Sequence, residues 1–556
     1  MAEPGAQRDA TTGATADATD ATTGATTDAA TDVATAADPE GDLRVDLRPP
    51  SPLARLTAWS GPPRDYRLTR WLILRLLGVV YLFGFLGILM QAPSLLGEHG
   101  LTPIGTFVER LRAADLGFWD FPSVLFWDSS DGAIIGWAVA GIVISAAVVI
   151  GYANLPMLLV LWFVYGSFVR VGQVWFGFGW EIQILETTLI AACLVHPWDP
   201  RPIRAPSPPL VSLVLTRWLA FRIMLGAGLI KLRGGACWTD LTCLDVHFET
   251  QPIPNPLSAV FHQLPHAVQA AGVLVNHVVE LVLPWFVFGP RRLRLLAGIG
   301  MATFQIILII SGNLAFLNWL TLIPILACFD DDFLRRLVPR RLRARLPAAA
   351  PVAQTPRYHR IAVGCFAVLV AILSIEVVKN LASSRQAMNR SYDRLAVVNT
   401  YGAFGTVTAE RHELVIEGTL DRDPATATWH AYELPCKPGD LARRPCILGP
   451  YHRRLDWLIW FAAMSDRPGD PWIAHFVWKL LDGDRAIREL LAVDPFDGAA
   501  PAFVRIRRFR YHLQPIGADT WWTRDGEQLW LPPMSRDDPE LHEALRRFGW
   551  PSPSRH

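Results

Sequence analysis

Residues 228 to 256 read GLIKLRGGACWTDLTCLDVHFETQPIPNP, and this stretch decides how the rest of the chain is interpreted. It begins at the end of an apolar run, at Lys231 and Arg233, and continues into a polar loop. The loop contains two cysteines, three acids, a histidine and three prolines within a few turns of chain. An apolar run followed by so dense a polar segment is typical of a membrane helix that ends in a functional loop.

The composition supports a membrane protein. Of 556 residues 51% are hydrophobic, 22 are Trp, and the mean hydropathy is +0.24. The apolar residues gather in blocks close to the ~20 residues that cross a bilayer as a helix. We expect about nine spans, each a helix of one polytopic bundle. The predicted spans are residues 71–90, 132–152, 156–170, 179–196, 211–232, 271–289, 295–312, 315–329 and 360–378.

Arginine-rich segments predict the orientation of these spans. They are the groups Arg64/Arg67/Arg70, Arg201/Arg204, Arg291/Arg292/Arg294 and the cluster from Arg335 to Arg345. With a cytoplasmic N-terminus and nine crossings, all four groups lie on the cytoplasmic face, as the positive-inside rule requires. The same topology exports the loop 233–270 and everything after residue 378. Spans 156–170 and 315–329 are short, so seven crossings with two re-entrant segments are the alternative, and both versions export the C-terminus.

The regions outside the bundle (66–380) differ from each other. Residues 1–55 form an Ala/Thr/Asp-rich tail that we expect to be disordered, because it has too little apolar surface to offset its ordering entropy. The pattern of residues 390–550 predicts that they form an exported, strand-rich α+β domain. Its expected strands are 397–405, 412–418, 429–434 and 505–513, the last of them an edge or half-buried strand, and its expected helices are 455–464 and 472–481.

Four of the seven cysteines are predicted to form disulfides. Cys237 and Cys243 share one exported loop, and Cys436 and Cys446 share another, so each pair should be bridged in an oxidising compartment. Thiol exchange with a client is the alternative, although neither pair has the Cys-x-x-Cys spacing that favours a reactive thiolate. Cys237, Cys243 and His247 match no zinc spacing, so no metal and no cofactor are expected. Charge is concentrated beside the apolar blocks, which indicates a membrane rather than a nucleic acid.

Several polar residues fall inside or at the ends of the predicted spans. Lys231 either reaches the interface with its long side chain or serves a site, where a buried lysine could act as a base. The others are expected to pair with one another in the bundle, since buried polar groups need partners. They include Glu181, Glu186, Arg222, His277, Glu280 and Asn313, with helical spacing bringing His277 close to Glu280.

Long motifs spread along the chain resemble the lipase maturation factor family. They include LGEHGLTP (96–103), NHVVELVLP (276–284), SGNLAFLNWLT (311–321), NTYGAFG (399–405) and YHRRLDWLIWFAA (451–463), together with the opening stretch. The likeness runs from about Arg70 to Trp550. Only four residues are Lys against 48 Arg, which with the Ala and Pro content indicates a GC-rich, bacterial genome. A bacterial member would lie in the plasma membrane, and a eukaryotic one in the endoplasmic reticulum membrane.

The resemblance implies a chaperone-like, non-enzymatic factor in the bilayer whose exported loop and C-terminal domain engage a secreted, lipase-like client. The residues assigned to that contact are Asp240, Asp245, His247, Glu249, Arg453, Arg454, Asp456 and Trp457. A fainter likeness links residues 227–238 to vitamin K-dependent carboxylase-type membrane enzymes. On that alternative Lys231 would be the catalytic base acting on a lipid-soluble substrate.

Overall fold

The computed structural model describes residues 64–343 and 355–550. The tail predicted to be disordered, residues 1–55, lies outside the described residues. Each of the nine predicted spans coincides with helical structure in the part of the chain that is described. Those helices are α2 (Arg67–Leu96), α4 (Asp131–Ile150), α5 (Leu155–Val171), α6 (Gly179–Ala192), α7 (Leu210–Arg233), α11 (His266–His277) with its continuation to Phe288, α12 (Arg291–Ser311), α13 (Leu317–Ile325) and α16 (Arg357–Ala382).

Six helices within the described residues are long and apolar enough to cross a membrane. They are α2, α4, α7, the segment His266–Phe288 that starts with α11, α12 and α16. Leu155–Val171 and Leu317–Cys328 are shorter apolar helices, and α6 has only 14 residues. The protein is therefore a multi-pass helical membrane protein, while the count of nine crossings is not confirmed.

Short capping interactions position the helices. The Ser130 side chain accepts a hydrogen bond from the Ala133 amide at the start of α4, and Asn154 does the same for Met157 at the start of α5. Such N-caps satisfy amide groups that the first helical turn leaves without partners. The segment after α11 changes to a π-helical turn at Val278–Val282 and then to a tighter helix through Leu283–Phe288, where Pro284 lacks an amide donor.

Small helices surround the long ones. Helix α3 (Ile104–Ala113) follows α2. Between α7 and α11 lie α8 (Ala236–Thr239), α9 (Cys243–Thr250) and α10 (Pro256–His262). Two more, α14 (Asp331–Leu337) and α15 (Arg340–Arg343), follow α13. Asn255 and Ser258 form a reciprocal capping box at the start of α10, which explains why a helix starts directly after the proline-rich end of the loop.

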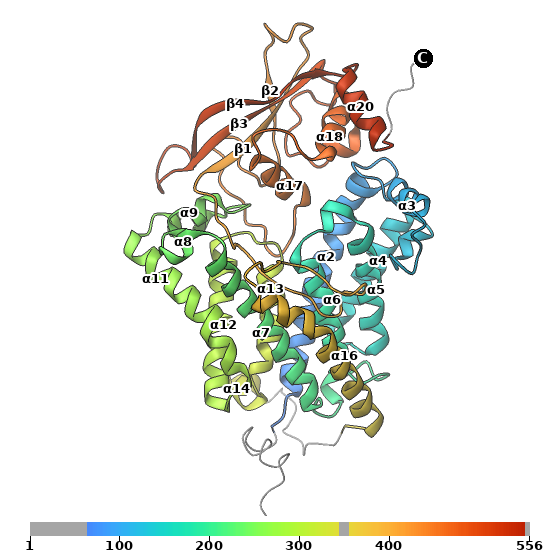
Figure 1. Ribbon diagram of the computed structural model, residues 1–556, viewed down its shortest axis with the longest axis vertical. Helices are drawn as coiled ribbons and strands as arrows, with labels where there is room; N and C mark the ends of the chain where they lie inside the picture. The colour runs from blue at the N-terminus through green and yellow to red at the C-terminus, as the bar shows by residue number, and fades with distance from the viewer. Residues whose placement is uncertain (1–63, 344–354, 551–556) are drawn as a thin grey trace, which may run out of the picture. The chain divides into compact units, whose positions relative to one another are not determined.

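The C-terminal domain is a four-stranded antiparallel sheet with helices. The strands are β1 (Arg411–Thr419), β2 (His430–Tyr432), β3 (Phe503–Leu513) and β4 (Trp522–Ser535), in the order β2-β1-β3-β4. Its helices are α17 (Arg454–Ala463), α18 (Pro471–Leu481), α19 (Arg485–Arg488) and α20 (Pro539–Arg547). Helix α17 packs on β1 and α18 on β3 (Figure 1). One hydrophobic cluster contains side chains of both the bundle and this domain, among them Phe85, Trp175, Ile416 and Trp457.

One strand prediction was wrong. Residues 397–405 form no strand but an extended segment that lies against α7, so closely that a Cβ on Gly226 would come within 2.4 Å of the Tyr401 carbonyl oxygen. Strand β3 is not an edge strand, because it pairs with both β1 and β4. Its alternating half-buried pattern was predicted correctly. Strand β4 and helix α20 were not anticipated.

Candidate functional site

The loop after α7 is held by a disulfide and by the 402–406 segment. Cys237 and Cys243 are bridged, as predicted, and so are Cys436 and Cys446. The Gly235 amide donates to the Gly405 carbonyl over 2.9 Å, and the indole of Trp238 donates to the Phe404 carbonyl over 2.9 Å. The start of the loop is thus fastened to a segment more than 160 residues later in the chain.

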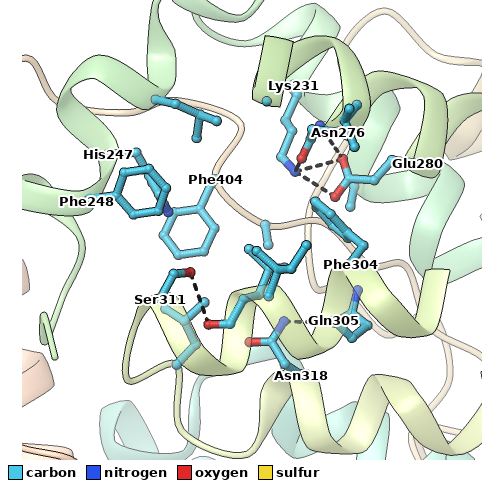
Figure 2. Close-up of a pocket in the computed structure, with 18 of the residues that line it drawn as sticks. Lys231, His247, Phe248, Asn276, Glu280, Phe304, Gln305, Ser311, Asn318 and Phe404 are labelled. Atoms are coloured by element: carbon cyan, nitrogen blue, oxygen red, sulfur yellow. Dashed lines mark hydrogen bonds and ion pairs between the residues drawn. The ribbon is translucent and has the colours of Figure 1, made fainter. Parts of the chain in front are cut away.

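Lys231 lies in an ion pair and does not extend to the membrane surface. Its Nζ is 2.6 and 2.7 Å from the two carboxylate oxygens of Glu280 and 2.9 Å from Oδ1 of Asn276 (Figure 2). Asn276 also donates to Glu280 over 3.1 Å, and the ammonium lies 4.9 Å from the centre of the Trp238 ring. All three polar side chains are buried. The ammonium and the carboxylate therefore neutralise each other at the wall of the bundle.

This ion pair forms one wall of a cavity of about 250 Å³. The remaining walls come from the helices α7 to α13 and from Ala403 and Phe404, and most of the lining side chains are apolar. At the opposite wall Asn318 donates to Gln305 over 2.8 Å, and Gln305 contacts the Met224 sulfur at 3.6 Å (Figure 2). The cavity has the composition of a small-molecule site, namely apolar walls with a few convergent polar groups.

His247 projects from α9 to this cavity without a hydrogen-bond partner among the described residues. Its ring is packed edge-to-face on Phe404, with the centroids 4.9 Å apart, and only 5% of the residue is exposed. Burial, assisted by the Lys231 charge, lowers the pKa of His247 to about 4. The imidazole is consequently neutral at physiological pH, with one donor and one acceptor nitrogen.

Some polar residues of the bundle also pair with the C-terminal part of the chain. Glu181 accepts from Arg454 on α17 over 2.8 Å and from the Tyr165 hydroxyl over 2.5 Å. Asn313 donates to the Cys446 carbonyl over 2.9 Å and accepts from the Leu448 amide over 2.8 Å. Glu181 therefore has one partner in the bundle, Tyr165, and one in the C-terminal domain, while Asn313 bonds to the segment before α17; the contacts with the C-terminal part were not predicted.

Glu186 and His277 are two further polar residues of the predicted spans. Glu186 pairs with Arg222 on α7, as expected for a bundle residue, but it also accepts hydrogen bonds from the Asn399 amide over 3.0 Å and the Tyr401 hydroxyl over 2.6 Å. His277 is not bonded to Glu280. Its Nε2 lies 3.0 Å from the Trp238 carbonyl oxygen.

A buried cluster on β1 connects the loop to the sheet and was missed in the sequence. Arg411 donates to Glu413 and also to the backbone carbonyls of Glu249, Gln251 and Pro252 at the end of α9. Lys437 donates to the other oxygen of Glu413 over 2.7 Å. The only local signal is the spacing of two residues, which places Arg411 and Glu413 on one face of a strand.

Most residues predicted to contact a client are buried in these connections. Arg454, Asp456 and Trp457 are at most 4% exposed, and Asp456 accepts from the Cys436 and Lys437 amides. His247 lines the cavity, and Glu249 accepts from the Leu513 amide over 2.7 Å. The other three retain exposed surface: Asp240 is exposed, while Asp245, which pairs with His266, and Arg453 are half-buried.

The fold and these connections define a class: multi-pass membrane proteins whose C-terminal domain is joined to the bundle by a buried ion pair and to the loop after α7 by buried hydrogen bonds. Residues 68–336 match the lipase maturation factor transmembrane domain, and residues 397–532 match the lipase maturation factor C-terminal domain. The chain therefore belongs to the lipase maturation factor family.

Individual relatives cover nearly the whole chain. Lipase maturation factor 1 of Mus musculus is 41% identical over 88% of this chain and 91% of its own length. The Homo sapiens protein of the same name is 40% identical over 91% and 95%. Lipase maturation factor 2 of Xenopus laevis is 28% identical over 87% and 85%. No solved structure matches, and the likeness to vitamin K-dependent carboxylase-type proteins receives no support from these comparisons.

Proposed function

We propose that this chain is a membrane factor that assists the maturation of secreted proteins, lipases among them, without catalysing a reaction on them. The observation that carries the proposal is the match to lipase maturation factor 1 over about nine tenths of the chain, which includes both family domains. Arg411 of the C-terminal domain makes buried hydrogen bonds to the end of α9 in the loop 233–270. The loop and the C-terminal domain are thereby connected and would act on a client together.

The domain limits and topology belong to the same proposal. A bundle over residues 66–380 with nine crossings leaves the N-terminus cytoplasmic, and it exports the loop 233–270 and the domain 390–550. Helices at all nine positions support this arrangement, as does the arginine distribution. The short α6 and α13 are mostly buried among the longer helices, so they need not match the full bilayer thickness. The membrane is the endoplasmic reticulum in a eukaryote and the plasma membrane in a bacterium.

The client would contact the exposed polar residues close to the loop. Asp240, Asp245 and Arg453 keep accessible surface, whereas the other predicted contact residues maintain the structure that presents them. Both disulfides also fall in this region, where they restrain the loop and the segment before α17. Restrained loops bind with a smaller entropic cost than flexible ones.

The test is complementation of cells that lack their own lipase maturation factor 1. The full chain should restore secreted lipase activity, whereas Asp240→Ala combined with Arg453→Ala should reduce it at unchanged abundance of the factor. Asp537→Ala is the matched control, because Asp537 is an exposed acid of the same domain region remote in sequence from the loop. Failure of the abundant, membrane-inserted full chain to restore any activity would refute the proposal.

A further inference from the structure

The cavity beside Lys231 is bordered on one side by helices that face lipid. Val268 and Val275 on α11 and Ile307 on α12 line it, and these residues are 50%, 54% and 39% exposed. Both helices belong to segments long and apolar enough to cross a membrane. Exposed apolar side chains on such segments lie against lipid chains. Helices α11 and α12 pack little against each other, so an opening between them would lead from the cavity to the bilayer.

The inner walls carry polar groups but no net charge. Lys231 and Glu280 neutralise each other, and Asn276 is bonded to both. His247 is different, because its ring nitrogens make no hydrogen bond to the described residues, and the 5% of the residue that stays accessible lies at the cavity that it lines. A neutral imidazole has one donor and one acceptor nitrogen, so His247 can hydrogen-bond to a ligand in the cavity without losing a bond to the protein.

The size of the cavity suits a single chain. A volume of about 250 Å³ exceeds the ~150 Å³ of an engineered apolar cavity that binds benzene, and it is below the range of large drug-like sites. A charged head group would have no unpaired counter-ion, since the carboxylate of Glu280 already neutralises Lys231. The chemistry therefore favours an uncharged amphiphile.

We propose that this cavity binds the acyl chain of one uncharged lipid of the monoacylglycerol type, which enters from the bilayer between α11 and α12. A hydroxyl or ester group of the lipid hydrogen-bonds to His247, and the chain lies along apolar residues such as Phe304 and Leu308. This site is separate from client contact and goes beyond the maturation role, because its occupant comes from the membrane.

The test is photolabelling of the full chain in lipid nanodiscs by a monoacylglycerol with a diazirine in its acyl chain. Labelled peptides should map to α9, α11 and α12. Leu308→Trp places an indole in the cavity and should lower this labelling about tenfold. Ile306→Trp is the control, because Ile306 lies on the same helix, is 51% exposed and does not line the cavity. Equal labelling of both variants would show only lipid that surrounds the protein, which would overturn the proposal.

A second variant tests the hydrogen bond and does not depend on how Leu308→Trp folds. His247→Phe keeps an aromatic ring against Phe404 but removes both ring nitrogens. Loss of one hydrogen bond of about 1 kcal/mol should reduce labelling by the monoacylglycerol several-fold, and leave labelling by a diazirine hydrocarbon unchanged. Stronger labelling by a diazirine fatty acid than by the monoacylglycerol would overturn the choice of an uncharged lipid. Since secretion is not measured, either failure leaves the maturation proposal standing.

Discussion

Two glutamates on α6 illustrate how single residues connect the chain. Glu181 binds Arg454, which lies 273 residues later, and Glu186 binds Arg222 together with the backbone at Asn399. All of these side chains are almost completely buried. Removing one partner of a buried ion pair costs far more than the pair contributes net, because the remaining charge stays buried without compensation.

The first prediction concerns the Glu181–Arg454 ion pair. Glu181→Gln should lower the free energy of unfolding by about 3–5 kcal/mol, because Arg454 would remain buried without its carboxylate. Thermal unfolding in detergent, followed by tryptophan fluorescence, would measure the change. Glu376→Gln is the matched control, because the Glu376–Lys379 pair is exposed and worth about 0–1 kcal/mol. Similar melting temperatures for the two variants would contradict the importance assigned to Glu181.

The second prediction concerns pH and His247. An unfolded histidine has a pKa near ~6.5, and that of His247 is about 4 in the folded protein. Between these values only the unfolded state binds the proton, so stability is complete above pH ~6.5 and decreases as the pH falls toward 4. This group contributes on the order of 3 kcal/mol to the decrease.

The measurement is the melting temperature at a series of pH values for the parent chain and for His247→Phe. The variant should show the smaller decrease between pH ~6.5 and ~4, since it has no imidazole to protonate at this position. His475, whose pKa burial also lowers to about 4, is present in both proteins and acts in the same direction. Identical pH dependence would show that His247 is not protected from protonation by the fold.

Among the elements, β1 connects the sheet to the loop. Its buried Arg411 donates to three backbone carbonyls at the end of α9, those of Glu249, Gln251 and Pro252, and also to the Glu413 carboxylate. A planar guanidinium with five N–H donors can make all of these bonds, whereas an ammonium has three donors. Its partner Glu413 is shared with Lys437. Arg411 therefore connects the loop to the sheet, together with the hydrogen bond from the Leu513 amide on β3 to Glu249.

The third prediction follows from that geometry. Arg411→Lys should destabilise the contact between loop and sheet by about 2–4 kcal/mol, because buried carbonyl groups lose their donors. Amide hydrogen exchange in residues 249–253 should become faster, while exchange in α2 stays unchanged. Arg510→Lys on the neighbouring strand is the control, since the partners of Arg510 within residues 64–343 and 355–550 are exposed carboxylates. Unchanged exchange in the Arg411 variant would contradict the prediction.

Sequence patterns anticipated the elements unequally. The apolar blocks located helices at all nine expected positions, and the half-buried alternation located β3. Strand β4 was not predicted because its residues 523–529 are all exposed and, apart from Gly526 and Leu529, polar or charged, so they show no alternation of apolar and polar residues. The segment 397–405 has strand-like residues, but its backbone donates to Glu186 and lies against α7 instead of pairing with a strand. Tertiary contacts of this kind override the intrinsic β propensity of the residues.

At the scale of the whole molecule, the number of crossings decides which surfaces a secreted client can reach. Nine crossings place the bundle's loop 233–270 and the sheet domain on the exported side. Crossing by the six long helices alone would return the C-terminal domain to the side of the N-terminus. The connections of Arg454 and Arg411 require only that the loop, the helix ends beside it and the sheet share one side of the membrane.

The fourth prediction tests this topology. Ala425→Cys, in an exposed connection between β1 and β2, should react with a membrane-impermeant maleimide in intact cells. Leu342→Cys, in α15 and also exposed, should react only after the membrane is permeabilised. The parent chain controls for its native thiols. Labelling of Leu342→Cys alone in intact cells would reverse the orientation, and labelling of neither would place both segments inside.

The sequence by itself determined the class of protein, the positions of the apolar helices and the two cysteine pairs. Apolar runs and short spacings are local properties, and the energy of burying them does not depend on which distant segment covers them. Only the tertiary structure decided that Glu181 binds Arg454, that Lys231 binds Glu280, and that His247 is left without a partner beside a cavity. Each of those outcomes depends on which charged groups are brought together after the helices pack, and burial then makes the pairing obligatory.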